Sequence, residues 1–327
     1  MRRDISAEIE RFPIAGSFRI SRGTKTEAEV VTCTISDGEA IGRGECVPYS
    51  RYGESLDLVK AAIESIAPAI RDGADRESLL KLLPAGAARN AVDCALWDLE
   101  AKMSGRRVQD IICSARQQAL TTAMTISLGE PDEMAQNARN NAFRPLLKVK
   151  VGTEDDRSRI RAVAEAAPES RIILDANEGW TPDNIVDHLA VAAQHRIALI
   201  EQPLPQGADD ILRTIAHPVP ICADESVHGA DDLDKLVGLY DAVNIKLDKT
   251  GGLTAAIDLR DRARGHGFAI MVGCMVGTSL AMAPAVLLAQ DADFVDLDGP
   301  LLLARDRSPA LRYTDSLVSP PEAELWG

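Results

Sequence analysis

The stretch "LLKVKVG" at residues 146–152 combines an apolar strand with two lysines. Its leucines and β-branched valines predict a short buried β-strand. Side chains along a strand alternate between its two faces, so we expect Lys148 and Lys150 on the same face. Burying two unpaired ammonium groups side by side is costly. The stretch therefore predicts that anionic groups from neighbouring elements lie next to these lysines.

Short apolar runs of this kind recur at regular intervals and are separated by segments of helix length. Strands that alternate with helices are typical of a parallel sheet, and eight of them predict a barrel with its helices outside. The 29 residues after the eighth run include Pro309, Pro320 and Pro321, so we expect no full eighth helix. The prediction is an α/β fold, a (β/α)7β modified TIM barrel. The eight runs are 121–127, 146–151, 171–176, 197–202, 220–225, 242–247, 268–273 and 294–298.

The first 112 residues have a different pattern, with strands first and helices after them. Residues 27–46 alternate around Asp37-Gly38, which is a hairpin turn signal. Residues 54–70 and 87–105 have apolar positions at helical spacing, and Gly105 suits a C-terminal cap. We therefore expect an α+β capping domain over residues 1–112, completed by the C-terminal tail at about 305–327. The barrel is then expected over residues 113–304.

The composition is that of a soluble globular protein, with 46% apolar and 26% charged residues. A net charge of −14 argues against a nucleic-acid surface and disfavours anionic membranes, so we expect neither partner. The six cysteines form no C-x-x-C pair, which predicts free thiols and a cytoplasmic protein. The composition leaves the oligomeric state open, a homo-oligomer included.

Carboxylates stand at the C-terminal ends of three consecutive predicted strands: Asp175, Glu201 and Asp224. These strand ends converge on one face of a barrel, where catalytic residues lie. Oxygen ligands without histidine or cysteine favour a hard ion, so we expect Mg²⁺, with Mn²⁺ as a substitute. The alternative, that each carboxylate separately caps a helix or pairs with a surface base, is weakened by their succession. Strand alternation directs the next residue, Glu225, away from this face.

Two lysines flank this trio from opposite sides, Lys150 on the second strand and Lys246 at the end of the sixth. A nearby Mg²⁺ and a second ammonium group would lower a lysine pKa, which would make a neutral amine available near pH 7. A base on one face of a metal-bound substrate and an acid on the other suit inversion of the carbon next to a carboxylate. The spacing therefore predicts a racemase or epimerase site.

Longer motifs surround these residues. They include "LDANEGW" (174–180), "LIEQPLP" (199–205), "ICADES" (221–226), "NIKLDKTGGL" (244–253), "GCMVGTS" (273–279) and "DLDGP" (296–300), with "PYSRYGES" (48–55) and residues 83–102 in the N-terminal part. The set resembles the enolase superfamily in its muconate-lactonizing branch, and most closely the dipeptide epimerases that act on L-Ala-D/L-Glu. In that family "DLDGP" separates the dipeptide epimerases from other members.

The resemblance implies a role for each matching residue. Lys150 and Lys246 would form the acid/base pair, and the three carboxylates would hold Mg²⁺. The substrate would be a small dipeptide whose C-terminal residue is epimerised, in murein peptide metabolism. The remaining matches imply substrate contacts: Lys148 to the substrate carboxylate, Asp296 and Asp298 to the α-ammonium, Arg22 from the capping domain to a carboxylate, and Thr125, Cys274 and Val276 along the pocket.

Other reactions of the same superfamily would use the same lysines and metal, among them N-acylamino acid racemisation, o-succinylbenzoate synthesis and cycloisomerisation. The pair Asp296 and Asp298 discriminates against them, because their substrates have no free α-ammonium to pair with it. A barrel that only binds a metal ion, without catalysis, would be expected to have lost a lysine or a carboxylate. None is lost in this sequence.

Overall fold

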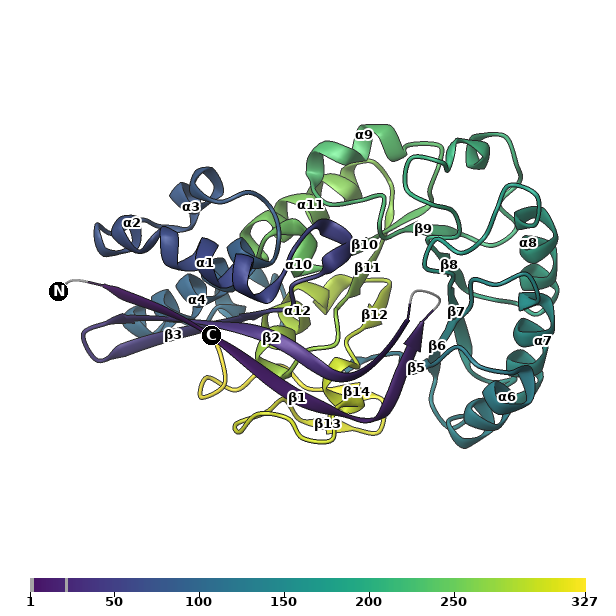
Figure 1. Ribbon diagram of the computed structural model, residues 1–327, viewed down its shortest axis with the longest axis horizontal. Helices are drawn as coiled ribbons and strands as arrows, with labels where there is room; N and C mark the ends of the chain where they lie inside the picture. The colour runs from purple at the N-terminus through teal and green to yellow at the C-terminus, as the bar shows by residue number, and fades with distance from the viewer. Residues whose placement is uncertain (1–2, 21–22) are drawn as a thin grey trace.

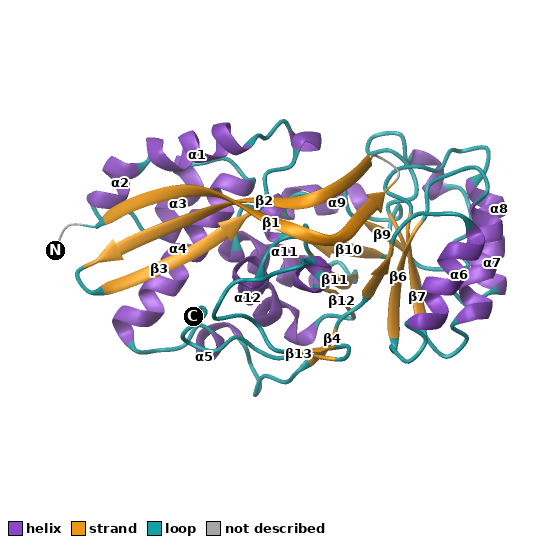
Figure 2. Cartoon of the chain, turned by 60° about the horizontal axis from the view of Figure 1, so that its bottom comes forward, coloured by secondary structure: helices purple, strands orange, loops and turns teal. Residues whose placement is uncertain are grey.

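The computed structural model describes residues 3–20 and 23–327, and it has two parts (Figure 1). The N-terminal part contains an antiparallel sheet in the order β1-β2-β3, formed by β1 (Asp4–Ile20), β2 (Gly23–Asp37) and β3 (Ala40–Cys46). Gly38 has φ +64° in the predicted turn between β2 and β3, which confirms the hairpin. Figure 2 shows that β1 and β2 extend from this sheet toward the barrel. There the Leu128 N–H donates to the Arg19 carbonyl at 3.2 Å.

Helices of the N-terminal part cover one face of this sheet. They are α1 (Leu56–Ser65), α2 (Ala67–Arg71), α3 (Arg76–Leu82) and α4 (Ala87–Ser104), preceded by the 3-10 helix η1 (Ser50–Tyr52). The predicted helical segment at 54–70 is divided at Ile66, because Pro68 has no N–H and begins a new helix near its first turn. Gly105 adopts a left-handed conformation with φ +69°, so the predicted cap of α4 is confirmed.

The barrel has eight parallel strands in the order β12-β11-β10-β9-β8-β7-β6-β5. The Ala123 N–H donates to the Val295 carbonyl at 2.8 Å, which nearly closes the ring between the first and last strands. All eight predicted strands are present, although the run at 121–127 is divided into β4 and β5. β4 (Leu120–Thr121) lies outside the barrel sheet. The eight barrel strands are β5 (Met124–Ile126), β6 (Leu146–Lys150), β7 (Arg171–Asp175), β8 (Leu199–Glu201), β9 (Ile221–Ala223), β10 (Ala242–Ile245), β11 (Ala269–Gly273) and β12 (Phe294–Asp296).

The outer helices are complete on most of the barrel but reduced between β8 and β10. The segment between β8 and β9 holds prolines at 203, 205, 218 and 220, which disfavour a long helix, and it forms only a short 3-10 helix. The segment between β9 and β10 also has only short helices, although it contains no proline. After β12 the 3-10 helix η5 (Gly299–Leu302) replaces an eighth helix, as predicted. The other helices are α5 (Gln109–Ile112), α6 (Pro131–Asn140), α7 (Asp156–Ala166), α8 (Ile185–Gln194), η2 (Asp210–Arg213), η3 (Ala230–Asp232), α9 (Leu233–Leu236), α10 (Leu247–Thr250), α11 (Leu253–Gly265), α12 (Ser279–Leu288) and η4 (Ala289–Asp291).

The C-terminal segment returns to the N-terminal part of the molecule. The short strand β13 (Tyr313–Thr314) pairs with β14 (Leu317–Val318), and β14 pairs with β4. Beyond them, the Trp326 indole donates to the Cys94 carbonyl at 3.0 Å, and the Gly327 N–H donates to Asp98 Oδ1 at 2.8 Å. Both acceptors belong to α4. The residue limits of the two domains stay a prediction.

All six cysteines are free thiols. Across residues 3–20 and 23–327, no helix is both long enough and apolar enough to cross a membrane.

Close packing of β3 against α4 depends on glycine. A Cβ added to Gly44 would lie 2.2 Å from the Ala91 carbonyl oxygen, and one added to Gly42 would lie 2.1 Å from that of Ala95. Backbone atoms cannot give way as a flexible side chain can. The small residues therefore set the distance between the sheet and its main helix.

We expect Gly44→Ala to lower the free energy of unfolding by about 1–3 kcal/mol, because the new methyl group overpacks this contact. Gly265→Ala is the matched control, since its added Cβ meets nothing within 4 Å at the end of α11. The control should leave stability unchanged or raise it slightly. Thermal and urea unfolding of both variants measure the difference, and equal midpoints would contradict this packing.

Candidate active site

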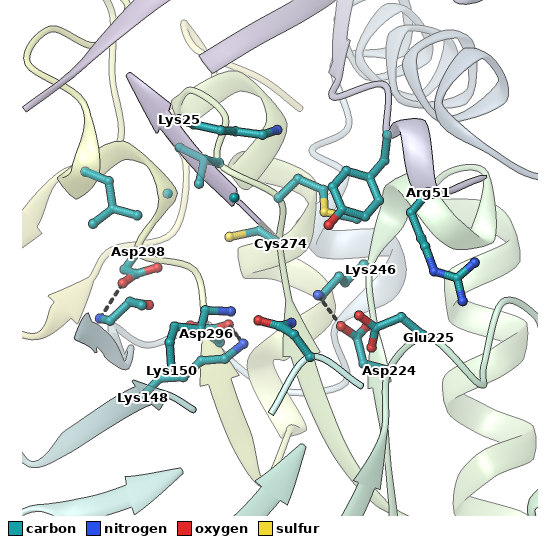
Figure 3. Close-up of a pocket in the computed structure, with 18 of the residues that line it drawn as sticks. Lys25, Arg51, Lys148, Lys150, Asp224, Glu225, Lys246, Cys274, Asp296 and Asp298 are labelled. Atoms are coloured by element: carbon teal, nitrogen blue, oxygen red, sulfur yellow. Dashed lines mark hydrogen bonds and ion pairs between the residues drawn. The ribbon is translucent and has the colours of Figure 1, made fainter. Parts of the chain in front are cut away.

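A cavity of about 450 Å³ opens at the C-terminal ends of the barrel strands. Its walls come from both parts of the molecule, as Figure 3 shows from one side. The N-terminal part contributes Gly23, Thr24, Lys25 and residues 49–52. The barrel contributes Thr125, Lys148, Lys150, Asn177, Asp224, Glu225, Lys246, Cys274, Met275, Val276, Asp296, Asp298, Gly299 and Leu302.

The floor of this cavity follows from strand alternation inside the barrel. One buried apolar residue from or beside each strand packs in a common cluster: Ala123, Leu146, Ile173, Leu199, Cys222, Ala242, Met271 and Phe294. Two residues further along each strand, the side chain has the same orientation and lies nearer the C-terminal end. Those positions are Thr125, Lys148, Asp175, Glu201, Asp224, Asn244, Gly273 and Asp296. An apolar layer thus supports a layer dominated by charged and polar side chains.

Lys148 lies at the centre of the charged layer. Its side chain is 3% exposed, and its Nζ is 3.0 Å from Asp175 Oδ2, 2.7 Å from Glu201 Oε2 and 2.6 Å from Asp296 Oδ2. These contacts offset the free-energy cost of burying the ammonium group, because each carboxylate compensates part of its charge. Lys150 Nζ lies 2.6 Å from Asp175 Oδ2, so both lysines of "LLKVKVG" are paired, as predicted.

Lys246 occupies the far side of the site. It follows β10, which is four strands away from β6 in the ring of eight. Its Nζ lies 2.6 Å from Asp224 Oδ2 and 3.8 Å from Glu201 Oε1. Lys150 and Lys246 therefore face the cavity from opposite sides, and the buried carboxylates lie between them.

The carboxylates respond differently to burial. Burial and the neighbouring charge of Asp175 raise the pKa of Glu201 to about 8. Burial also acts on Asp224, but the ammonium groups of Lys246 and Lys249 hold its pKa well below the usual range. Of Asp175, Glu201 and Asp224, only Glu201 has a raised pKa.

The protein's own groups raise the pKa of Lys246. Burial alone would lower the pKa of Lys246, but Asp224 and Glu201 raise it well above its usual value. The lowering predicted from the sequence depends on a bound Mg²⁺, so it stays a prediction. Among the protein groups, the nearest charges to Lys246 are carboxylates.

The carboxylate oxygens of Asp175, Glu201 and Asp224 are the kind of ligand that a hard divalent cation prefers, but they do not converge on one point. Within residues 3–20 and 23–327, no three Asp, Glu, His or Cys side chains converge as metal ligands do, because lysine ammonium groups lie between the carboxylates. Burial and the charge of Asp175 raise the pKa of Glu201 even though Lys148 Nζ lies 2.7 Å from Glu201 Oε2. Buried carboxylates whose negative charge the ammonium groups offset only in part suit a divalent cation that displaces those groups.

Asp296 and Asp298 lie on one wall of the cavity. Asp296 ends β12 and pairs with Lys148, while its Oδ1 accepts no hydrogen bond from the described residues. Asp298 accepts the Thr125 N–H at 2.7 Å, and burial together with Asp296 raises its pKa to about 6. Thr125, Cys274 and Val276 also line the cavity, so most of the predicted substrate contacts are assembled there. Arg22 lies outside the described residues.

The N-terminal part supplies side chains that strand patterns did not indicate. Arg51 makes two hydrogen bonds to Glu178, at 2.9 and 3.0 Å, and Tyr52 packs edge-on against His228 with ring centroids 4.7 Å apart. Lys25 lines the opposite side of the cavity (Figure 3). The contacts of Arg51 with Glu178 and of Tyr52 with His228 hold the loop around η1 against the barrel. "PYSRYGES" was the only sequence signal for this loop.

Glu225 corrects one prediction. Alternation was expected to turn it away from the site, but it lines the cavity beside Asp224. The reason is that β9 ends at Ala223, so strand alternation does not extend to Glu225.

Comparison with known proteins identifies relatives along nearly the whole chain. The family model "Mandelate racemase / muconate lactonizing enzyme, N-terminal domain" matches residues 4–113, and "Enolase C-terminal domain-like" matches residues 132–323. L-Ala-D/L-Glu epimerase of Escherichia coli (strain K12) is 45% identical over 93% of this chain and 96% of its own length. N-acetyl-D-glutamate racemase of Pseudoalteromonas sp is also 45% identical, over 91% of this chain and 95% of its own length.

Solved structures have the same architecture. An enolase family member from Agrobacterium tumefaciens with homology to dipeptide epimerases, described with bound sodium and L-Ala-L-Glu, is 61% identical with a TM-score of 0.98. It is covered completely and covers 99% of this chain. The dipeptide epimerase of Enterococcus faecalis V583, complexed with Mg and L-Leu-L-Tyr, is 28% identical with a TM-score of 0.91, and each chain covers 98% of the other.

Proposed function

This chain belongs to the mandelate racemase / muconate lactonizing enzyme family, and on that premise we propose that it is an isomerase that epimerises the C-terminal residue of L-Ala-D/L-Glu dipeptides. The observation that carries the proposal is the pair Asp296 and Asp298 on the cavity wall, beside Lys148. A free α-ammonium is the substrate group that such a pair suits. The dipeptide named for the Agrobacterium relative supports the same substrate class.

The proposed chemistry uses the two opposed lysines. Lys148 would pair with the substrate carboxylate, which orients the α-carbon between Lys150 and Lys246. A neutral lysine on one face takes the α-proton, so the C–H bond breaks and an N–H bond forms. The protonated lysine on the other face then donates its own proton to the same carbon. One proton enters and one leaves, and the configuration inverts.

Asp175, Glu201 and Asp224 would hold the metal ion, for which Mg²⁺ is our proposal and Mn²⁺ a substitute. When bound, a divalent cation stabilises negative charge that develops on the substrate carboxylate. It also neutralises the carboxylates that otherwise attract Lys150 and Lys246, and it would counter the raised pKa of Lys246. Relatives solved with Mg support this choice.

A second candidate is racemisation of N-acylated glutamate. The N-acetyl-D-glutamate racemase relative is as similar in sequence as the epimerase of Escherichia coli. An acylated substrate has no ammonium group for Asp296 and Asp298. It would leave these two buried carboxylates facing a neutral amide, which favours the dipeptide.

We also propose Arg22 as a contact to the glutamate side chain. A place in murein peptide metabolism in the cytoplasm stays a prediction.

The wall carboxylates should set the substrate preference. We expect Asp298→Asn to lower kcat/KM for L-Ala-L-Glu by roughly 10–100-fold, since a charge-assisted hydrogen bond contributes about 1.5–3 kcal/mol. Turnover of N-acetyl-L-glutamate should not fall in parallel, because that substrate lacks the ammonium. Exposed Asp183→Asn is the control. If Asp298→Asn lowers kcat/KM equally for both substrates, Asp296 and Asp298 do not bind the ammonium group.

Metal removal should abolish turnover. We expect activity to fall to background after exhaustive chelation and to return with Mg²⁺ or Mn²⁺, because Asp175, Glu201 and Asp224 offer only oxygen ligands. Polarimetry of the dipeptide solution, with the ion added back, measures how much activity returns. Full activity in the chelated protein would remove the metal from the mechanism, as would a crystal structure with the ion elsewhere.

The two lysines should be separable by mutation. Lys150→Ala and Lys246→Ala should each lower epimerisation by orders of magnitude, since a positioned acid or base contributes about 10²–10⁴-fold. Each variant should still exchange the α-hydrogen of one epimer with deuterium, and the two variants should select opposite epimers. The measurement is mass spectrometry of each dipeptide epimer after incubation in D₂O. Exchange of the same epimer by both variants would contradict the two-face geometry.

A further inference from the structure

Lys249 is a buried ammonium group outside the cavity wall that the proposed proton transfers do not use. It is 2% exposed, on the short helix α10. Its Nζ donates to Asp224 Oδ1 at 2.5 Å, to the Asp224 carbonyl at 2.5 Å and to the Asn244 carbonyl at 3.0 Å. An ammonium group has three N–H donors, and all three are committed here. Lys249 therefore has no donor left for a substrate.

The two oxygens of Asp224 are divided between two lysines. Oδ1 receives Lys249, while Oδ2 lies 2.6 Å from Lys246 Nζ. Lys246 and Asp224 line the cavity, and Lys249 does not. Lys249 thus occupies the oxygen of Asp224 that is turned away from the cavity and leaves the other oxygen to the site.

Contacts from the N-terminal part hold the helix that carries Lys249. Arg89 of α4 donates to the Thr250 carbonyl at 2.7 Å and to the Gly251 carbonyl at 3.1 Å. Asp248 Oδ1 accepts the Val47 N–H at 3.0 Å and the Asn90 amide at 2.8 Å. The N-terminal part therefore holds the residues on both sides of Lys249, while Asp224 and Asn244 hold its ammonium group.

We propose that Lys249 is a positioning residue that fixes the carboxylate of Asp224, so that Oδ2 alone is presented to a metal ion in the site. The inference rests on the proposed role of Asp224 as a metal ligand. Charge alone would work against the lysine, because a cation this close repels a divalent ion. An orienting contact to a ligand has the opposite effect, and losing one typically weakens metal binding 10–100-fold. The two effects differ in sign, which makes the inference testable.

The test is calorimetric titration of Mg²⁺ into chelated protein without substrate. We expect Lys249→Met to raise the Mg²⁺ dissociation constant 10–100-fold. The matched control is Lys246→Met, which removes the ammonium from the other oxygen of the same aspartate. Since Lys246 competes with the ion for Oδ2, the control should bind Mg²⁺ as tightly as the wild type or more tightly.

Circular dichroism and thermal unfolding establish that each variant is folded. If Lys249→Met does not fold, Lys249→Gln takes its place, because glutamine also lacks the charge. The same rise in the Mg²⁺ dissociation constant is expected for it. Unchanged or tighter Mg²⁺ binding by the Lys249 variant would overturn the inference, and so would equal weakening in the Lys246→Met control. A wild-type chain that binds no Mg²⁺ would overturn the metal site of the proposed function, and the inference with it.

Discussion

The burial of lysine ammonium groups against carboxylates inside the barrel is the constraint on which the rest of the structure depends. Lys148 contacts Asp175, Glu201 and Asp296 in a layer that is almost inaccessible to water. None of these charges is tolerable there without the others, because an unpaired buried ion costs several kcal/mol. The apolar layer beneath them fixes their depth, and the strand order fixes which charges meet.

The N-terminal part completes the site and also holds it in place. Arg307 of the C-terminal segment donates to Glu45 of β3 and to Thr278 of the barrel, both at 2.8 Å. Asp248 joins the start of α10 to Val47. These polar contacts connect the N-terminal part to the strand ends that carry the lysines. The cavity therefore lies between two parts of the molecule that hydrogen bonds outside the cavity hold together.

Much of this arrangement could be predicted from the sequence, because it follows from strand periodicity. The eight strands, the convergence of Lys148, Asp175 and Glu201, and the missing eighth helix all depend on local patterns. The prediction was wrong where a pattern ended. Glu225 enters the cavity because β9 stops at Ala223, and the proline-containing segment between β8 and β9 forms only a short 3-10 helix.

Features that depend on distant contacts could not be predicted. The direction of the Lys246 pKa shift is set by how close Asp224 and Glu201 lie in space. Similarly, the pairing of Arg51 with Glu178 joins residues from the two parts of the chain, and neither side alone indicates the other. The three acceptors of Lys249 also belong to other elements, Asn244 of β10 and Asp224 just after β9.

The central claim is that this charged layer inverts the α-carbon of a free dipeptide. The most direct measurement is a proton NMR time course of L-Ala-L-Glu in D₂O with wild-type protein and Mg²⁺, beside a parallel one with N-acetyl-L-glutamate. We predict loss of the glutamyl α-proton signal and appearance of L-Ala-D-Glu, faster than any change in the acetylated compound. Faster exchange of N-acetyl-L-glutamate, or a dipeptide that keeps both its α-proton and its configuration, would contradict the claim.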